Sequence, residues 1–158
     1  MIILSKLADY GVIVATHLAA AAPEQVNAMH LAADTRLPQT TVAKVLKLLA
    51  KAGIVTALRG AAGGYRLARS PHLVSVAEII AAIDGSFGMT QCTSTLGPCE
   101  RLHFCPTRPH WHRINEAVGQ ALARVTLDEM TTGPLLPIHS PALAPAPAAP
   151  PKFETILS

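Results

Sequence analysis

Aromatic and charged residues are scarce in this 158-residue chain, at 4% and 15% of the sequence. Alanine supplies much of the apolar half of the residues, so we expect a core of helices packed through small side chains rather than a large β-sandwich. No apolar run reaches the roughly 18 residues that a membrane span requires, which argues against transmembrane insertion. The length favours one domain of ordinary size.

Cysteine is also rare: Cys92, Cys99 and Cys105 are the only three, and all lie within fourteen residues of one another. Three cysteines cannot all pair within one chain, which disfavours a disulfide framework and favours a reducing, cytoplasmic setting. Enzyme signals are lacking as well. No Ser/His/Asp or Cys/His arrangement has recognisable local context, and the glycines at 60–64 match neither dinucleotide nor phosphate-loop fingerprints. We therefore predict a cytoplasmic protein that is not an enzyme.

Acidic residues are absent from the whole segment 37–77, which contains six lysines and arginines. Charge is uneven along the chain: residues 1–70 have eight basic and three acidic side chains, whereas residues 71–132 have four and six. The two parts therefore differ in net charge, at +5 and −2. A positively charged N-terminal half is typical of proteins that bind a polyanion such as nucleic acid.

Helix signals dominate the first half of the chain. Ser5 is expected to cap a first helix that ends before residue 23. Asn27 is expected to cap a second, short helix that stops near residues 35–37. A third helix is expected from Pro38 to Gly53, followed by β-prone runs at 54–58 and 65–68 around a glycine-rich turn. The capping box from Ser75 to Glu78 then opens a short helix that ends at residues 84–85. Three helices followed by a hairpin predict a mainly α winged helix-turn-helix, which we assign to residues 1–85.

The second half of the chain divides into three expected segments. Residues 86–109 form a long glycine- and proline-containing loop, and long loops inside compact domains tend to be functional. Residues 110–132 are expected to form one long helix, with apolar residues at 3-4-3-4 spacing that favour a homodimer: Trp111, Ile114, Val118, Ala121 and Val125. Residues 133–158 hold seven of the thirteen prolines and are expected to be a disordered tail.

The polar face of the third helix and the hairpin turn are the candidate contacts to double-stranded DNA. Gln39, Thr40 and Thr41 begin that helix, at the end that enters the major groove in a helix-turn-helix, and Lys44 lies one turn further. Arg59, Gly60 and Arg66 belong to the turn and its flanks, where glycine lets the backbone approach a groove edge.

The three cysteines have the spacing Cys92-x6-Cys99-x5-Cys105, too wide for the C-x2-C pairs of most structural zinc sites. Three thiolates in one loop can nevertheless converge on one soft metal centre, and iron-sulfur clusters are held mostly by thiolates. A zinc site and three unpaired, redox-reactive thiols remain the alternatives. Candidates for a fourth ligand close by in the sequence are Glu100, His103, His110 and His112.

Four features together are specific to one family: the segment SKLADYG at 5–11, the segment LLAKAGIVTALRGAAGGYRLAR at 48–69, the short helix ending in Ile-Asp-Gly at 83–85, and the three loop cysteines before a long helix. Over residues 1–132 the chain resembles the IscR/NsrR type of winged-helix repressor, most closely the regulators of the SUF iron-sulfur assembly system. The resemblance implies a homodimeric transcription factor that represses cluster-assembly genes. Its DNA affinity would be set by a [2Fe-2S] or [4Fe-4S] cluster supplied by iron-sulfur assembly proteins.

The resemblance also implies a ligand set. The three cysteines would bind the cluster, but the histidine that IscR places three residues after the third cysteine corresponds to Arg108, which cannot ligate. Relatives of the NsrR type instead use an aspartate from the first helix of the partner subunit, and Asp9 occupies that place. His103 is the second candidate. A metal-free cysteine sensor of oxidants or nitric oxide with the same fold is the alternative function.

Overall fold

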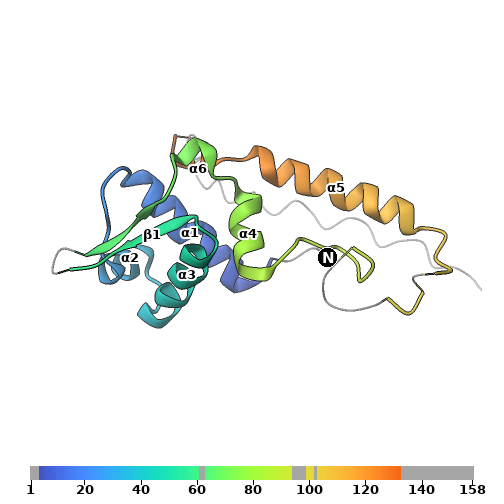
Figure 1. The fold of residues 1–158 in the computed structure, drawn as a ribbon, viewed down its shortest axis with the longest axis horizontal. Helices are drawn as coiled ribbons and strands as arrows, with labels where there is room; N and C mark the ends of the chain where they lie inside the picture. Colours follow the sequence, from blue (N-terminus) through green and yellow to red (C-terminus); the bar gives the residue numbers. More distant parts are fainter. Residues whose placement is uncertain (1–3, 61–62, 94–98, 102, 133–158) are drawn as a thin grey trace, which may run out of the picture.

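The computed structural model describes residues 4–60, 63–93, 99–101 and 103–132. Its elements follow in the order α1 (Lys6–Ala20), α2 (Ala28–Thr35), α3 (Gln39–Lys51), β1 (Val55–Leu58), β2 (Gly64–Leu67), the 3₁₀ turn η1 (Pro71–Leu73), α4 (Val76–Asp84), α5 (Arg108–Arg124) and α6 (Leu127–Thr132). In Figure 1, α1 to α4, the hairpin and α6 form one body, and α5 projects away from it. The predicted mainly α fold with one small hairpin is confirmed. The tail expected at 133–158 lies outside the described residues.

The helix starts follow the local sequence signals. Ser5 Oγ accepts a hydrogen bond from the Ala8 N–H at 3.0 Å, and the Asn27 side chain caps α2 in the same way. The capping box of α4 is present: Glu78 N–H donates to Ser75 Oγ at 3.3 Å, and Ser75 N–H donates to Glu78 Oε2 at 3.0 Å. Each cap satisfies N–H groups that the first turn of a helix leaves unpaired.

Apolar side chains from α1, α3 and α4 meet in the core of the body. The fully buried large side chains include Val14 and Leu18 of α1, Leu46 and Leu49 of α3, and Ile79 of α4. Gly11 lets α1 and α4 approach closely, because a Cβ added there would meet Ile83 Cδ1. Within the described part of the chain, no helix combines the length and apolarity needed to cross a membrane.

The hairpin packs one face on this core. Val55 and Leu67 are cross-strand partners and both are buried. Val26, just before α2, extends the sheet through two backbone hydrogen bonds to Tyr65, of 2.8 and 2.9 Å. Gly64 is needed at this contact, since a Cβ there would lie only 2.9 Å from the Val26 carbonyl oxygen. The hairpin is thereby fixed beside α2 and α3.

The expectation of one continuous helix over 110–132 is wrong. Helix α5 ends at Arg124, Val125 is extended, and α6 begins at Leu127. Thr126 and Glu129 form a reciprocal cap at the start of α6: Thr126 N–H donates to Glu129 Oε2 at 3.2 Å, and Glu129 N–H donates to Thr126 Oγ1 at 3.4 Å. This cap competes with helix continuation at Thr126.

The break returns the chain to the body. Val76 N–H donates to the Val125 carbonyl and Leu127 N–H donates to the Val74 carbonyl, both at 2.9 Å. Leu127 is fully buried in the same core as α1 and α3. Residues 125–132 therefore pack as part of the winged-helix body rather than as an extension of α5.

Candidate nucleic-acid interface and cysteine loop

Helix α3 exposes its polar residues from its first turn onward. Pro38 is the N-cap residue, one position before the helix rather than inside it, and Gln39 and Thr40 are exposed while Thr41 is half-buried. Lys44 is exposed on the next turn, and the apolar residues of α3 face the core. The side chains predicted to contact DNA on this helix are thus available at its N-terminal end.

The turn between α2 and α3 is tight. Only Arg36, Leu37 and Pro38 separate the two helices, which is the connection length of a helix-turn-helix. Arg36 has a φ of 56°, the left-handed conformation that closes the C-terminus of α2, and its N–H donates to the Ala33 carbonyl at 3.3 Å. This conformation redirects the chain so that α3 packs across α2.

The hairpin end forms the wing. Arg59 and Gly60 are exposed, and Gly60 has a φ of 117°, a region open to glycine but strained for other residues. Arg66 is exposed and pairs across the sheet with Thr56, on the face opposite the buried pair of Val55 and Leu67. Positions 61 and 62 lie outside the described residues. The cations predicted for the wing therefore face away from the core.

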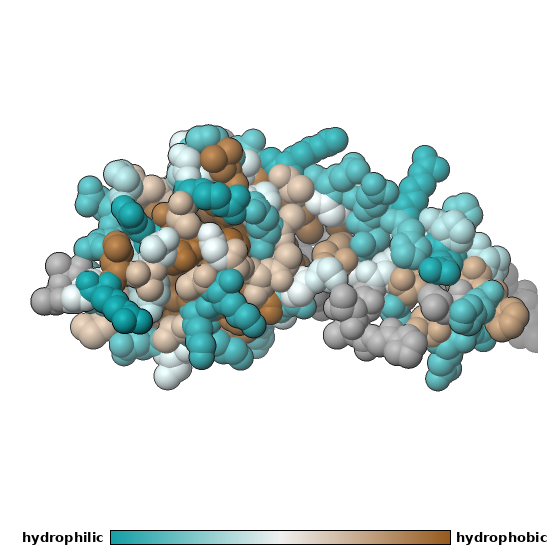
Figure 2. Space-filling view, in the orientation of Figure 1, coloured by the Kyte–Doolittle hydropathy of each residue, from teal (hydrophilic) through white to brown (hydrophobic). Residues whose placement is uncertain are grey.

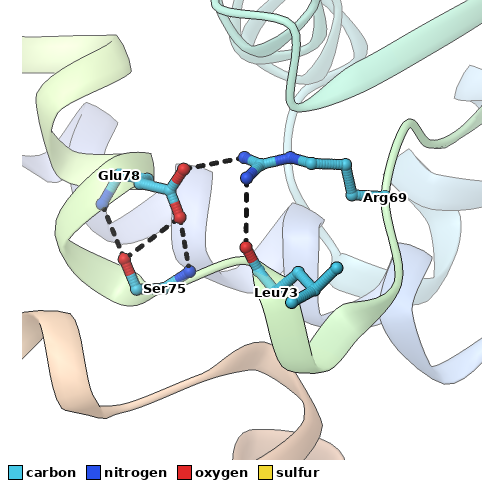
Figure 3. A network of polar contacts seen from close by, with 4 residues as sticks. All are labelled: Arg69, Leu73, Ser75 and Glu78. Atoms are coloured by element: carbon cyan, nitrogen blue, oxygen red, sulfur yellow. Dashed lines mark hydrogen bonds and ion pairs between the residues drawn. The ribbon is translucent and has the colours of Figure 1, made fainter.

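One cation of the acid-free segment has a structural partner instead. Figure 3 shows the Arg69 guanidinium between α4 and the turn before it: Nη2 lies 2.7 Å from Glu78 Oε1, and Nη1 donates to the Leu73 carbonyl at 3.1 Å. Partial burial raises the pKa of Glu78, but hydrogen bonds from Arg69 and Ser75 outweigh it and hold this pKa below its ordinary value of 4.5. Arg69 thus joins the base of the wing to the N-terminus of α4.

The three cysteines are free thiols, and each is half-buried. Thr90 Oγ1 lies 3.1 Å from Cys92 Sγ, and Thr107 Oγ1 lies 3.3 Å from Cys105 Sγ. The hydrogen bond from Thr107 lowers the pKa of the Cys105 thiol, because it favours the thiolate. Two of the three predicted ligands therefore have a threonine hydroxyl beside the sulfur.

The structure does not bring the predicted ligands together in one chain. Among the described residues, no group of three or more His, Cys, Asp and Glu side chains is close enough to hold a metal ion. His103, His110 and His112 are exposed, as are Glu100 and Arg108.

Asp9 is exposed in the first turn of α1. Ser5 Oγ donates to Asp84 Oδ1 at 2.7 Å, which places the start of α1 beside the end of α4. The cysteine loop begins just after α4, so Asp9 lies on the helix end nearest the start of this loop.

The apolar positions of α5 are only partly covered. No residue of α5 is buried, and Ile114 is 42% exposed. Trp111 and Val118 are half-buried, while Ala121 and Val125 are exposed. In the view of Figure 2 the outer edge of α5 is mostly hydrophilic, and the hydrophobic patches lie mainly over the body.

Two contacts of α5 and the residues after it were missed by sequence reasoning. Asn115 of α5 hydrogen-bonds the start of the cysteine loop, and a lone asparagine in a predicted helix offers no signal for such a contact. Thr126 and Glu129 cap the start of α6 and so break the helix after α5. Here the sequence did contain a signal, because Thr-x-x-Glu is the same capping-box pattern that marked Ser75 and Glu78.

Three helices, a tight turn between the second and third, and a hairpin with outward cations define a winged helix-turn-helix protein. The Rrf2 family model, described as an iron-dependent transcriptional regulator, matches residues 4–133. The chain belongs to the Rrf2 family.

Known relatives and solved structures agree with this assignment. The HTH-type transcriptional regulator IscR of Vibrio parahaemolyticus is 36% identical over 84 residues, which cover 53% of this chain and 49% of the relative. IscR of Xenorhabdus nematophila is 35% identical over 82 residues, with 52% and 49% covered. The chain thus spans about half the length of the curated relatives it matches.

Two solved structures share the fold over most of both chains. CymR of B. subtilis, described as its global cysteine regulator, superposes with a TM-score of 0.69 at 26% identity and covers 83% of this chain and 97% of its own. IscR of T. potens superposes with a TM-score of 0.64 at 27% identity, with 82% and 85% covered.

Proposed function

We propose that this protein is a cytoplasmic, DNA-binding transcriptional repressor. The observation that supports it best is the exposure of Gln39, Thr40 and Lys44 at the start of α3 on the same body as an outward-facing wing. Side chains at the start of a recognition helix reach base edges in the major groove, and cations on a wing contact phosphates. Arg59, Gly60 and Arg66 supply the wing contacts. Thr41 is half-buried and contributes less side-chain surface to the groove.

Gel-shift titration with DNA from upstream of the protein's own gene tests this proposal. A scrambled duplex of the same length and base composition is the control. We expect tighter binding to the upstream DNA, and a steep weakening of both complexes as salt rises, because cations that neutralise phosphates release counterions. Binding that does not discriminate between the two duplexes, or that does not respond to salt, contradicts the proposal.

We also propose that an iron-sulfur cluster, [2Fe-2S] or [4Fe-4S], controls this DNA binding. The donor set fits such a group chemically: Cys92, Cys99 and Cys105 are unpaired, partly accessible thiols in one loop, and thiolates are the usual cluster ligands. Asp9 is the proposed fourth ligand, with His103 as the second candidate. When bound, the cluster supplies sensitivity to oxidants, nitric oxide and iron supply.

The homodimer is part of this proposal, with α5 as its interface. The apolar residues of α5 that a single chain leaves exposed, Ile114 and Ala121, support it. By the resemblance to relatives of the NsrR type, Asp9 of one chain would complete the ligand set of its partner. Ordering of residues 86–109 against α5 would then fix the separation of the two recognition helices, which alters operator affinity.

Anaerobic reconstitution with iron and sulfide, followed by visible absorption and native mass spectrometry, tests the cluster. We expect a coloured dimer whose mass includes the cluster. We further propose that the genes it regulates are those for iron-sulfur assembly. A colourless protein with stoichiometric zinc contradicts the cluster while leaving the DNA proposal intact.

A metal-free thiol sensor with the same fold is the second candidate function. It is favoured by one observation, the lowered pKa of Cys105 beside Thr107, since a thiolate reacts fastest with oxidants. Metal analysis of freshly purified protein separates the two functions. Protein free of iron and zinc, whose DNA affinity changes on mild oxidation and returns on reduction, supports the thiol sensor and contradicts the cluster.

A further inference from the structure

We infer that Asn115 is a positioning residue that holds the first part of the cysteine loop, and with it Cys92, against helix α5. The side-chain amide of Asn115 contacts the loop backbone at two points. Met89 N–H donates to Asn115 Oδ1 at 3.0 Å, and Asn115 Nδ2 donates to the Phe87 carbonyl at 3.1 Å. The loop residues are 28 and 26 positions away in the sequence, so the contact is tertiary.

The chemistry of this contact requires an amide. The Phe87 carbonyl and the Met89 N–H both face the Asn115 side chain, and one asparagine side chain offers the matching donor and acceptor. A carboxylate at position 115 would keep the acceptor and lose the donor, and a glutamine would place both groups one methylene further out. Asn115 thus joins α5 to the loop backbone through one accepted and one donated hydrogen bond.

The contact reaches Cys92 through one turn. Beyond Met89, the Thr93 N–H donates to the Thr90 carbonyl at 3.0 Å, and Thr90 N–H donates to Thr93 Oγ1 at 3.1 Å. This closed turn holds Thr90 Oγ1 3.1 Å from Cys92 Sγ. Asn115 fixes the residues before the turn, and the turn fixes the thiol, so the first predicted ligand has a defined place beside α5.

This role of Asn115 extends the proposed function, and its effect on cluster binding rests on that function. Asn115 lies on α5, four residues after Trp111 and three before Val118, which belong to the apolar positions of this helix. This spacing puts Asn115 on the same face of α5 as Trp111 and Val118, which are half-buried, so this face holds the loop. The exposed Ile114 and Ala121 would remain available to the partner. Binding of a cluster by Cys92 would be coupled to the dimer helix through this side chain.

The test compares Asn115→Ala and Asn115→Asp with Gln120→Ala, a matched control on an exposed position of the same helix, in the full chain. Hydrogen exchange of the Met89 amide is measured first, in cluster-free protein. Because two hydrogen bonds are lost, we expect exchange to accelerate about tenfold or more in Asn115→Ala. It should be intermediate in Asn115→Asp, which keeps the acceptor for this N–H but loses the donor to the Phe87 carbonyl, and it should stay near the wild-type rate in Gln120→Ala. Unchanged exchange in Asn115→Ala overturns the inference.

The second readout is the lifetime of the reconstituted cluster under a chelator, followed by visible absorption. We expect it to shorten several-fold in Asn115→Ala, with the midpoint of urea unfolding close to that of Gln120→Ala. An unchanged lifetime despite faster Met89 exchange overturns the link to the cluster. If wild-type protein takes up no cluster, the proposed function fails. The role of Asn115 is then decided by Met89 exchange together with the rate of alkylation of Cys92 relative to Cys99. Faster exchange and faster Cys92 alkylation in Asn115→Ala support that role, and wild-type values of both overturn it.

Discussion

Arg69 and Glu78 form an ion pair in which Nη2 lies 2.7 Å from Oε1, and this pair joins the base of the wing to the capping box of α4. Both side chains are 41% exposed, so water screens their attraction and the pair by itself contributes little to stability. Its importance is geometric. The same carboxylate accepts from Ser75, and Ser75 pairs with Thr126 in the bridge that brings the chain back from α5. Glu78 therefore lies where the base of the wing, α4 and the chain after α5 meet.

Replacement of Glu78 by alanine should lower the free energy of unfolding by about 1 kcal/mol at pH 7, through loss of the capping box and the ion pair. The pKa of Glu78 is lowered in the folded protein, so this contribution is present above 4.5 and is lost as the pH falls through the folded value. Urea unfolding at several pH values should show the difference from wild type decreasing as the pH falls below 4.5. A pH-independent difference, or an equal loss in the exposed control Glu116→Ala, contradicts this role.

Leu127→Ala should lower the free energy of unfolding by about 3 kcal/mol, because Leu127 is fully buried in the core of the body. The matched control is Met130→Ala on the same short helix, where the side chain is 41% exposed and the expected loss is below about 1 kcal/mol. Urea unfolding measures both. Equal effects of the two substitutions would show that α6 is not part of the core.

Gly11→Ala should destabilise the protein by about 0.5–1.5 kcal/mol, because the added methyl group meets Ile83 Cδ1 and forces the end of that half-buried side chain away from its preferred rotamer. In an Ile83→Val background, which lacks that atom, the same change should be neutral or stabilising by up to about 1 kcal/mol, since alanine favours a helix over glycine. A double-mutant cycle by urea unfolding measures the coupling. Identical effects of Gly11→Ala in the two backgrounds would refute the close approach of α1 and α4.

Lys44→Ala and Arg59→Ala should affect DNA binding differently. Lys44 is one turn inside the recognition helix, so its loss should narrow the difference in affinity between upstream and scrambled DNA. Arg59 lies at the wing, so its loss should weaken both complexes and reduce the slope of log affinity against log salt by about 1. Anisotropy titrations over a salt series measure both quantities. Wild-type behaviour of both variants would contradict the proposed interface.

The N-terminal body could be predicted from the sequence because its signals are local. Ser5, Asn27 and Ser75 cap the helices that follow them, and Gly53, with a φ of 71°, follows the end of α3. The break after α5 was missed because Val125 continues the apolar spacing of Trp111 and Val118, although Thr126 and Glu129 offer a local capping signal. The backbone hydrogen bonds that fix the break come from residues about fifty positions earlier. Local periodicity does not contain that information.

The candidate site was predicted unevenly for the same reason. The outward positions of α3 follow from helical period, and their exposure is confirmed for Gln39, Thr40 and Lys44. The pairing of Arg69 with Glu78 and the contact of Asn115 with the loop depend on tertiary approach, which no local pattern encodes. Whether Asp9 and the three cysteines share a metal centre depends on a second copy of the chain, and it stays a proposal.

One comparison decides whether a cluster on the cysteine loop controls DNA binding. The dissociation constant for the same upstream duplex is measured anaerobically, by fluorescence anisotropy at fixed salt, for cluster-loaded protein and for the same preparation after cluster removal. We expect the two dissociation constants to differ by about 5- to 150-fold, the range of ordinary coupling between two sites. We expect no difference for a Cys92→Ala variant treated in the same way. Equal dissociation constants for loaded and cluster-free wild-type protein would contradict this role of the cluster.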